Sequence, residues 1–348
     1  MKHIAPLGFF DDYLLEERLS KLGNPLEKLD SFIDWNIFES AINEAFKKPE
    51  LIKSKGGRPA FGKLMLFKAL IIQSLYNLSD EQLEYQIIDR TSFKKFLGLK
   101  KSDRVPDSRT YWHFREQLIK SDTILSLFDA FNARLDRLGI FANEGKMVDA
   151  TFVDVPKQRN SREENKEVKE GKVPVEWQEN THKLAQKDID AKWTKKNNIS
   201  FYGYKNHIKA GTGTKLIRKY VVTDASVHDS QAMENLLDDT DKGEELYADG
   251  AYTGKASEEI YDRKKVVNRI NEKGYKNRPL TEEQKKSNRE KSKVRARVEH
   301  IFGFMENSMN GSFIRTIGIE RAKAKIGMMN IVYNICRCVQ LKMQITMG

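Results

Sequence analysis

The chain has 348 residues, of which 39% are hydrophobic and 32% are charged, and this supports about two globular domains. No apolar run approaches the ~20 residues that a membrane span needs, and the N-terminal residues lack a signal-peptide layout. The formal net charge of +11 favours a polyanionic partner such as nucleic acid, although a generic basic protein would have the same balance. The two cysteines, Cys336 and Cys338, share one predicted helix and are interpreted as reduced thiols of a cytosolic protein.

Apolar spacings near 3.6 residues predict short helices throughout residues 1–140. The segment "LSDEQLEYQIIDR" opens with a capping box formed by Ser79 and Gln82. Short helices joined by brief turns favour a helix-turn-helix-like domain for DNA binding or dimerisation, with a plain helical bundle as an equal alternative. The basic segment "KSKGGRP" suits a phosphate backbone or minor groove, so Arg58 and the nearby Lys63 are candidate DNA contacts.

The pattern changes near Gly145, where strands begin. Period-2 and β-branched runs predict strands at "KMVDATFVDV", "ISFYGYKNHIKAG" and "KLIRKYVVTDAS", the last two joined as a hairpin. A helix at "SVHDSQAMENLLDD", a strand at "EELYADGAY", a helix at "GKASEEIYDRKK", a strand at "VVNRI" and two long helices follow. The order predicts an α/β (α+β) domain over residues 141–348, with a mixed sheet covered by helices.

A polar, charge-dense insertion at about residues 157–198 separates the first two predicted strands. A connection of this length is usually functional or disordered, and we expect a mobile, partly helical segment. It carries Trp177 and Trp193, which are candidates for base stacking or for contact with a partner subunit.

Three carboxylates stand out near the ends of predicted elements. Asp149 lies in the first strand, Asp249 follows the strand of "LYADGAYTG", and Glu299 lies in the long helix "RVEHIF". If the first and fourth strands are neighbours, the two aspartates face each other, and a helix across that edge supplies Glu299. Clustered carboxylates repel each other, and a divalent metal relieves that repulsion. Two such ions about 4 Å apart can catalyse phosphoryl transfer. Alternatively, Asp249 is only a helix N-cap.

Five blocks in order resemble a bacterial insertion-sequence transposase of the DDE class, in the group typified by insertion sequence five. They are "VDATFVDVPKQRN", "WTKKNNISFYGYKNHIKA", "VVTDASVHDSQAMENLL", "YADGAYTG" and "RVEHIFGFM", and the region from "GRPAFGKLML" to "FLGL" resembles that group's helical domain. The resemblance implies an RNase H-like fold, catalytic and metal-binding acids Asp149, Asp249 and Glu299, and Mg²⁺ or Mn²⁺, with two ions. It further implies cleavage of transposon ends followed by strand transfer into target DNA.

The partners expected from this resemblance are terminal inverted repeats and target DNA, bound by a homodimer or larger homo-oligomer in the bacterial cytoplasm at the nucleoid. Related transposases carry a Tyr and an Arg before the last acid and a Lys after it. Arg295 matches the Arg, whereas Ser292 and Glu306 occupy the other two positions. We therefore expect Arg295 to contact phosphate, and Arg297 with less support.

Other residues have both a functional and a structural interpretation. Lys205, His207 and Lys209 alternate along one predicted strand, so their shared face either binds DNA or is solvated. Tyr252 either stacks on a base or packs beneath the turn after Asp249. His228 could assist proton transfer, but a His before a helix more often caps or packs, and Asp229 is the expected N-cap.

Two alternatives to the transposase remain. One is an RNase H-like metal-dependent DNA nuclease that cuts without strand transfer. The other is a domesticated sequence-specific DNA-binding protein, which the three intact acids disfavour.

Overall fold

The computed structural model describes residues 11–47, 60–141 and 144–347. The chain divides into two compact units, one of residues 1–123 and 335–348 and the other of residues 124–334. The division differs from the predicted boundary at residue 140, because helix α8 (Thr123–Arg137) lies almost wholly in the second unit. The end of the last helix, α16 (Ile319–Met347), lies in the first unit. Within the described residues, no helix is both long and apolar enough to cross a membrane.

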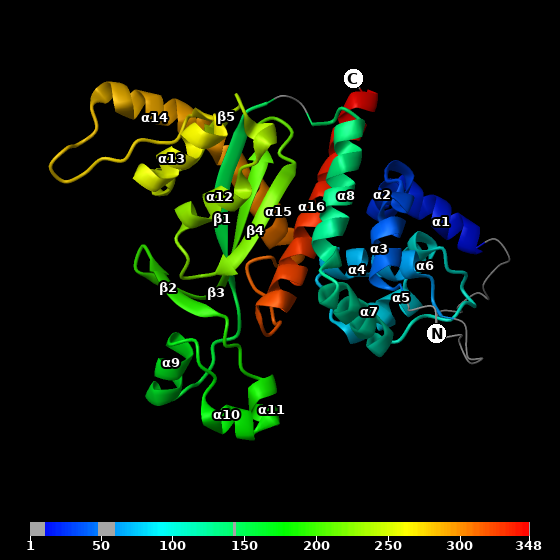
Figure 1. The fold of residues 1–348 in the computed structure, drawn as a ribbon. Helices are drawn as coiled ribbons and strands as arrows, with labels where there is room; N and C mark the ends of the chain where they lie inside the picture. The colour runs from blue at the N-terminus through cyan, green and yellow to red at the C-terminus, as the bar shows by residue number, and fades with distance from the viewer. Residues whose placement is uncertain (1–10, 48–59, 142–143, 348) are drawn as a thin grey trace, which may run out of the picture. The chain divides into compact units, whose positions relative to one another are not determined.

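The first unit is helical, as predicted (Figure 1). The capping box of Ser79 and Gln82 is present, and Gly98 ends a helix with the left-handed φ of +71° that favours glycine. Phe38 and Phe67 are fully buried at its centre, with ring centroids 4.8 Å apart. Its elements are α1 (Asp11–Lys21), α2 (Pro25–Phe32), η1 (Trp35–Phe38), α3 (Glu39–Ala45), α4 (Lys63–Leu75), α5 (Asp80–Asp89), α6 (Thr91–Leu97) and α7 (Ser108–Lys120).

The second unit is built on a six-stranded mixed sheet (Figure 1). Strand β3 lies between β4 and β1, which is followed by β5 and β6, and β2 pairs with the early part of β3. The first three long strands are antiparallel, whereas β5 is parallel to β1 and β6 to β5. This order and direction define an RNase H-like sheet, as predicted. The strands are β1 (Lys146–Asp154), β2 (Lys192–Lys196), β3 (Ile199–Gly211), β4 (Ile217–Asp224), β5 (Glu245–Tyr247) and β6 (Val267–Asn268).

Helices cover both faces of this sheet. On one face, Val148 of β1 packs with the apolar side chains of α12 (Met233–Leu236) and with Tyr261 of α13 (Lys255–Lys264). On the other face, Asn206 of β3 exchanges hydrogen bonds with Asn330 of α16 at 2.9 and 3.2 Å. Successive strand residues point to opposite faces, so the face of Asn206 is also the face of Asp149.

The long predicted helix "REKSKVRARVEHIFGFMENS" is divided in the structure. Helix α14 (Glu282–Arg295) passes into the 3₁₀ turn η5 (Ala296–Val298), and α15 (Glu299–Met309) follows. A 3₁₀ stretch inside a helical run often marks a functional hinge. Here the break makes Glu299 the first residue of α15.

The polar insertion contains α9 (Arg162–Lys169), α10 (Val175–Glu179), α11 (Thr181–Ala185) and the strand β2, so the expectation of partial helix is confirmed. Trp177 is fully buried, and its Nε1 donates to Oε1 of Glu164 at 2.6 Å. The prediction that Trp177 stacks on a base is therefore wrong, because the ring belongs to the small core of the insertion. Trp193 remains 50% exposed.

Candidate active site

The parallel pairing of β1 and β5 brings Asp149 and Asp249 to the same place. Met147 pairs with Tyr247, and continuing this register by two residues sets Asp249 beside Asp149. Because side chains alternate along a strand, both carboxylates point to the face covered by α14 and α15. The expected adjacency of the first and fourth predicted strands is thus confirmed.

The capping interpretation of Asp249 also holds. Its Oδ1 accepts a hydrogen bond from the backbone N–H of Ala251 at 2.8 Å, and it is the N-cap of the turn η4 (Gly250–Tyr252). The second carboxylate oxygen has no hydrogen-bond partner within the described residues. One oxygen therefore fixes the turn and leaves the other for a ligand.

The carboxyl of Asp149 is the perturbed acid of this cluster. Its pKa is raised to about 6, chiefly by burial, and the charges of Asp249 and Glu299 act in the same direction. The backbone N–H of Ala150, at 2.8 Å from Oδ1, and the guanidinium of Arg295, whose Nη1 is 2.7 Å from Oδ2, act in the opposite direction. Asp249 and Glu299 are therefore both close enough to act electrostatically on Asp149, whose burial favours a cationic partner.

Glu299 is exposed at the start of α15, and its carboxylate has no hydrogen-bond partner in the part of the chain that the structure describes. No group of three Asp, Glu, His or Cys side chains among the described residues is arranged to hold a metal ion. The guanidinium of Arg295 occupies one oxygen of Asp149. Apart from Arg295, the three carboxylates have no basic partner among the described residues, and such oxygen donors suit a hard divalent cation.

The basic residues of β3 correct the expectation of a DNA-binding face. Lys205, His207 and Lys209 share one face of the strand, but their exposed fractions are 6%, 0% and 1%. Lys205 donates to Asp229 at 2.8 Å, and Lys209 donates to Asp238 at 2.9 Å and to Asp241 at 2.6 Å. They cannot reach DNA, because loops and α12 cover this face.

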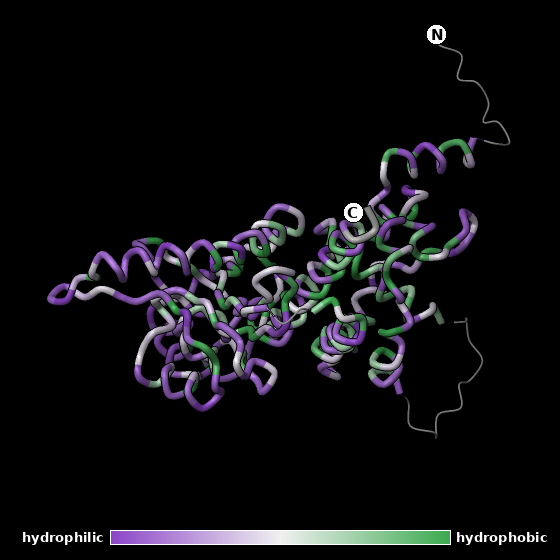
Figure 2. Tube along the Cα trace, turned by 90° about the horizontal axis from the view of Figure 1, so that it is seen from above, coloured by the Kyte–Doolittle hydropathy of each residue, from purple (hydrophilic) through white to green (hydrophobic). Residues whose placement is uncertain are grey.

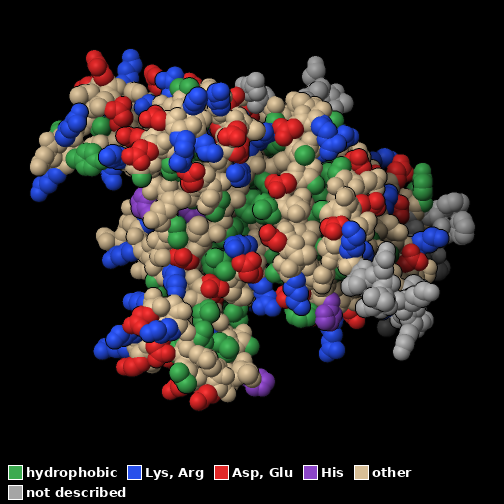
Figure 3. All heavy atoms as spheres, in the orientation of Figure 1, with side chains coloured by type: hydrophobic (Ala, Val, Ile, Leu, Met, Phe, Trp, Pro, Cys, Tyr) green, Lys and Arg blue, Asp and Glu red, His purple; other side chains and the backbone are tan. Residues whose placement is uncertain are grey.

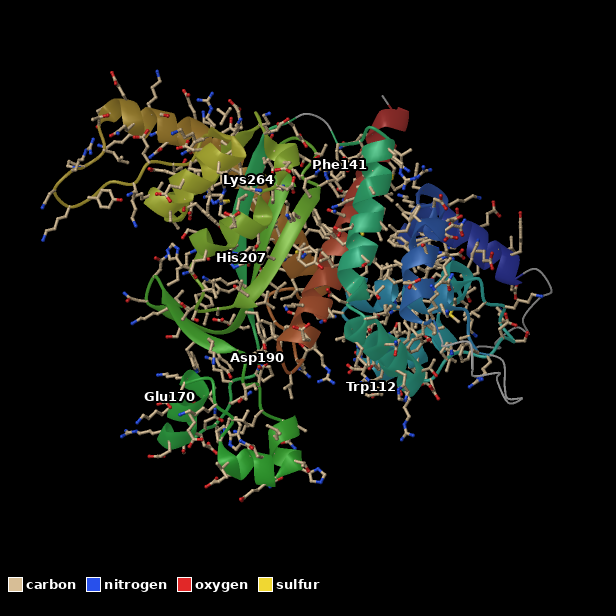
Figure 4. All side chains as sticks on the ribbon, in the orientation of Figure 1. Trp112, Phe141, Glu170, Asp190, His207 and Lys264 are labelled. Atoms are coloured by element: carbon tan, nitrogen blue, oxygen red, sulfur yellow. The ribbon has the colours of Figure 1, made fainter. Side chains whose placement is uncertain are left out.

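His207 is buried without a charge. Its Nε2 lies 2.9 Å from Oγ1 of Thr223, and its Nδ1 is buried without a partner. Burial lowers its pKa to about 4, with Lys205 acting in the same direction and Asp229 against it. Figure 4 places the residue within the layer of strands.

Tyr252 and His228 have structural roles, and Tyr252 lies near Asp149 and Asp249. Tyr252 is fully buried, so the structure supports packing beneath the turn and contradicts base stacking. Its hydroxyl has no partner in the described part of the chain, and burial raises its pKa well above the usual range, with Asp149 adding to the effect. His228 is the N-cap of η2 (Asp229–Ala232), where its Nδ1 accepts from the N–H of Ser230 at 3.3 Å. The expected cap, Asp229, instead binds Lys205.

The remaining candidates lie in different surroundings. Arg297 is exposed, and its Nη1 donates to the carbonyl oxygen of Thr212 at 3.0 Å. Lys63 begins α4 and donates to Oδ1 of Asn43 at 3.3 Å. Arg58 lies outside the described residues, as does the segment "KSKGGRP".

Comparison with known families identifies the class of protein. A family model described as "Transposase DDE domain" matches residues 142–335, which is more than half of the chain. A second model, described as "Transposase domain (DUF772)", matches residues 14–117. The chain belongs to the DDE transposase family and is a DNA transposase. Enzymes of this family generally use divalent metal ions.

Among solved structures, the chain is similar to a piggyBac transposase synaptic complex with hairpin DNA, determined by cryo-EM. The TM-score is 0.47 and the sequence identity is 11%, over 93% of this chain and 76% of that chain.

Proposed function

We propose that the chain cleaves the ends of an insertion sequence and joins them to target DNA, using Asp149, Asp249 and Glu299 as its catalytic acids. The observation that carries the proposal is the β1–β5 register, which sets two of the acids side by side, with the third at the start of the helix that follows Arg295. Bound Mg²⁺ or Mn²⁺, as two ions held by these carboxylates, would activate the attacking oxygen and stabilise the leaving oxygen.

The residues of the chain prepare this site for a polyanion. Asp249 is fixed by its bond to Ala251, and Gly250 and Ala251 keep bulk away from the carboxylate. The guanidinium of Arg295 donates to Asp149. A scissile phosphate would offer this guanidinium another anionic acceptor besides the carboxylate. Arg295 would then orient the phosphate while Asp149 becomes free to bind a cation.

The proposed partners are the terminal inverted repeats and the target DNA, brought together by a homodimer or larger assembly. We place the protein in the bacterial cytoplasm at the nucleoid, where its substrate lies. The helical first unit would supply end recognition, with Lys63 at the start of α4 and Arg58 in the preceding basic segment as its candidate DNA contacts.

A cleavage and joining assay tests the proposal. The protein is incubated with Mg²⁺, a labelled cognate end and a target plasmid. The substitution Asp249→Asn keeps the size of the side chain but removes its charge, and it should lower the cleavage rate by roughly 10³-fold or more. End binding should change little, because the variant adds no negative charge and creates no cavity.

Asp239→Asn is the matched control, because Asp239 lies in the short 3₁₀ turn η3 (Asp239–Asp241), where its side chain is fully exposed and 3.9 Å from Nζ of Lys264. It should retain normal cleavage. Full activity in Asp249→Asn would overturn the assignment of the acids. Cleaved ends without joined product would instead indicate a nuclease, and end binding without any cleavage would indicate a domesticated DNA-binding protein.

A further inference from the structure

A projecting arm connects β6 to the turn η5 and to α15, the helix that begins at Glu299. The arm comprises residues 269–295, in which an extended segment runs outward and α14 returns toward the acids (Figure 1). The two limbs are joined near the base by a hydrogen bond from Asn271 Nδ2 to Ser292 Oγ at 2.9 Å. Further out, the backbone of Glu272 exchanges two 2.9 Å hydrogen bonds with the side chain of Asn288. At the tip, Tyr275 and Arg278 close a turn with two backbone hydrogen bonds of 3.0 Å. The two limbs of the arm are therefore held together by hydrogen bonds from its base to its tip.

The arm holds a large share of the positive charge of the chain. Its 27 residues include ten Lys or Arg and four Glu, a net charge of +6, compared with +11 for the whole protein. Figure 3 shows Lys and Arg side chains along this projecting edge of the second unit. Six of the basic residues are exposed and pair with no acid among the described residues: Lys273, Lys276, Arg278, Lys286, Arg289 and Lys293.

Burial does not account for this part of the fold. Helix α14 has no buried residue, and a helix that is polar on every face needs side-chain ion pairs or contacts outside its own domain to stabilise it. The structure gives only one ion pair within α14, between Lys285 and Glu282, among the described residues. Figure 2 draws this end of the unit mostly in the hydrophilic colour. Tyr275 is 64% exposed at the tip, between Lys273, Lys276 and Arg278. An exposed ring among unpaired cations suits a nucleic acid, which offers both phosphates and flat apolar surfaces.

The arm also leads directly to the acids. Its last residue is Arg295, which binds Asp149, and Glu299 follows after the turn η5. With 14 residues, α14 is about 21 Å long, which corresponds to about six base pairs of duplex DNA. A duplex held at the acids and continuing past α14 would lie against the unpaired lysines.

We propose that the arm of residues 269–295 binds the DNA duplex beside the cleavage point, through phosphate contacts from its tip and from the exposed side of α14. The inference rests on the proposed function for the position of the cleavage point. The binding itself follows from the charge, exposure and shape of the arm. Unpaired lysines and arginines release condensed counterions when they meet phosphates, so the contacts must appear in the salt dependence of binding.

The test measures the affinity of the full-length protein for a fluorescently labelled mixed-sequence duplex over a series of salt concentrations. The triple variant Lys273→Gln, Lys276→Gln and Arg278→Gln neutralises the tip. It should weaken binding by about tenfold or more and lower the slope of log K against log salt by about 2 to 3 units. The tip side chains are exposed, so the variant should fold normally, and its urea unfolding curve checks this.

The matched control is the triple variant Lys166→Gln, Lys169→Gln and Lys172→Gln in the insertion. It removes the same charge from exposed side chains, one of which is paired with Glu170. The control should leave the salt slope close to that of the wild type. Equal slopes for the wild type and the tip variant would overturn the proposal. So would equal losses in the two variants, which would mean that only total charge matters.

Light scattering on the same samples addresses a second copy of the chain as the partner of the arm. A tip variant that changes oligomeric state but keeps the wild-type salt slope would contradict DNA binding by the arm. The proposed function fails in a different way, by the absence of metal-dependent cleavage in the wild type. The salt slopes are measured without cleavage and remain informative in that case.

Discussion

Two basic regions of the second unit look similar in the sequence and differ completely in the structure. On β3, the side chains of Lys205 and Lys209 are buried, and each has a carboxylate within 3 Å. On the arm, Lys273 and Lys276 are exposed and have no acid partner among the described residues. Net charge is therefore a poor guide to a DNA-binding surface. Exposed cations without an acid partner are typical of such a surface. Buried cations that are paired with carboxylates belong to the protein interior.

The sharpest test of this comparison is Lys209→Ala. The substitution leaves the buried carboxylate of Asp241, which is 1% exposed, without its cation, and should lower the free energy of unfolding by about 3–5 kcal/mol. Urea denaturation measures the change. Lys276→Ala on the arm is the control, and its free energy of unfolding should lie within about 0.5 kcal/mol of the wild type. Equal stability of the two variants would contradict the conclusion that Lys209 is a structural cation and Lys276 is not.

A smaller effect is expected from His207 on acidification. The folded pKa of about 4 lies below the ~6.5 of a solvated imidazole, so the unfolded chain binds a proton at higher pH than the folded chain. Stability from the neutral ring is complete above about pH 6.5 and is lost as the pH falls toward 4. Between about pH 7 and pH 5, the wild type should lose about 2 kcal/mol through this residue.

The variant His207→Gln checks this result, because glutamine can still bond to Thr223 and does not titrate. Urea unfolding of both proteins at neutral and acidic pH gives two differences in stability. The loss on acidification should be smaller in the variant. Equal losses would mean that His207 is not the group that takes up the proton on unfolding.

The smallest expected effect concerns Tyr252, which separates packing from DNA contact. Its buried hydroxyl has no partner, so Tyr252→Phe removes a desolvated polar group without leaving a cavity. The free energy of unfolding should stay within about 0.5 kcal/mol of the wild type or increase slightly. Affinity for a DNA end, measured by fluorescence anisotropy, should not change. A large loss of affinity at unchanged stability would restore the DNA-contact interpretation.

Much of the second unit could be predicted from local patterns. The strand at residues 199–211, the hairpin to β4 and the helix at "GKASEEIYDRKK" follow from periodicity and turn residues, which act over a few positions. The adjacency of β1 and β5 could be inferred because the acids needed a common place. Strand β5 itself is shorter than predicted, since Asp249 caps a turn instead of continuing the strand.

The errors have one physical origin. The two-residue periodicity of a strand predicts which side chains share a face. It does not predict whether another layer of the structure covers that face. The pattern therefore predicts correctly that Lys205, His207 and Lys209 share a face, but it does not predict that this face is buried. In the same way, the sequence "REKSKVRARVEHIF" is helical at every position, and the turn at η5 arises where Arg295 reaches Asp149, which lies 146 residues away in the chain. Contacts of this range depend on the completed fold.

The absence of buried residues on α14 has a consequence for how such enzymes can change. Residues 272–279 at the tip of the arm are all exposed, so substitutions or added residues near Tyr275 remove no core contact. The proposed DNA contacts of the arm can then vary between relatives, while the three proposed catalytic acids stay fixed by strand register and helix position. In an engineered version, the segment around the tip is the place to exchange sequence without redesigning the catalytic domain.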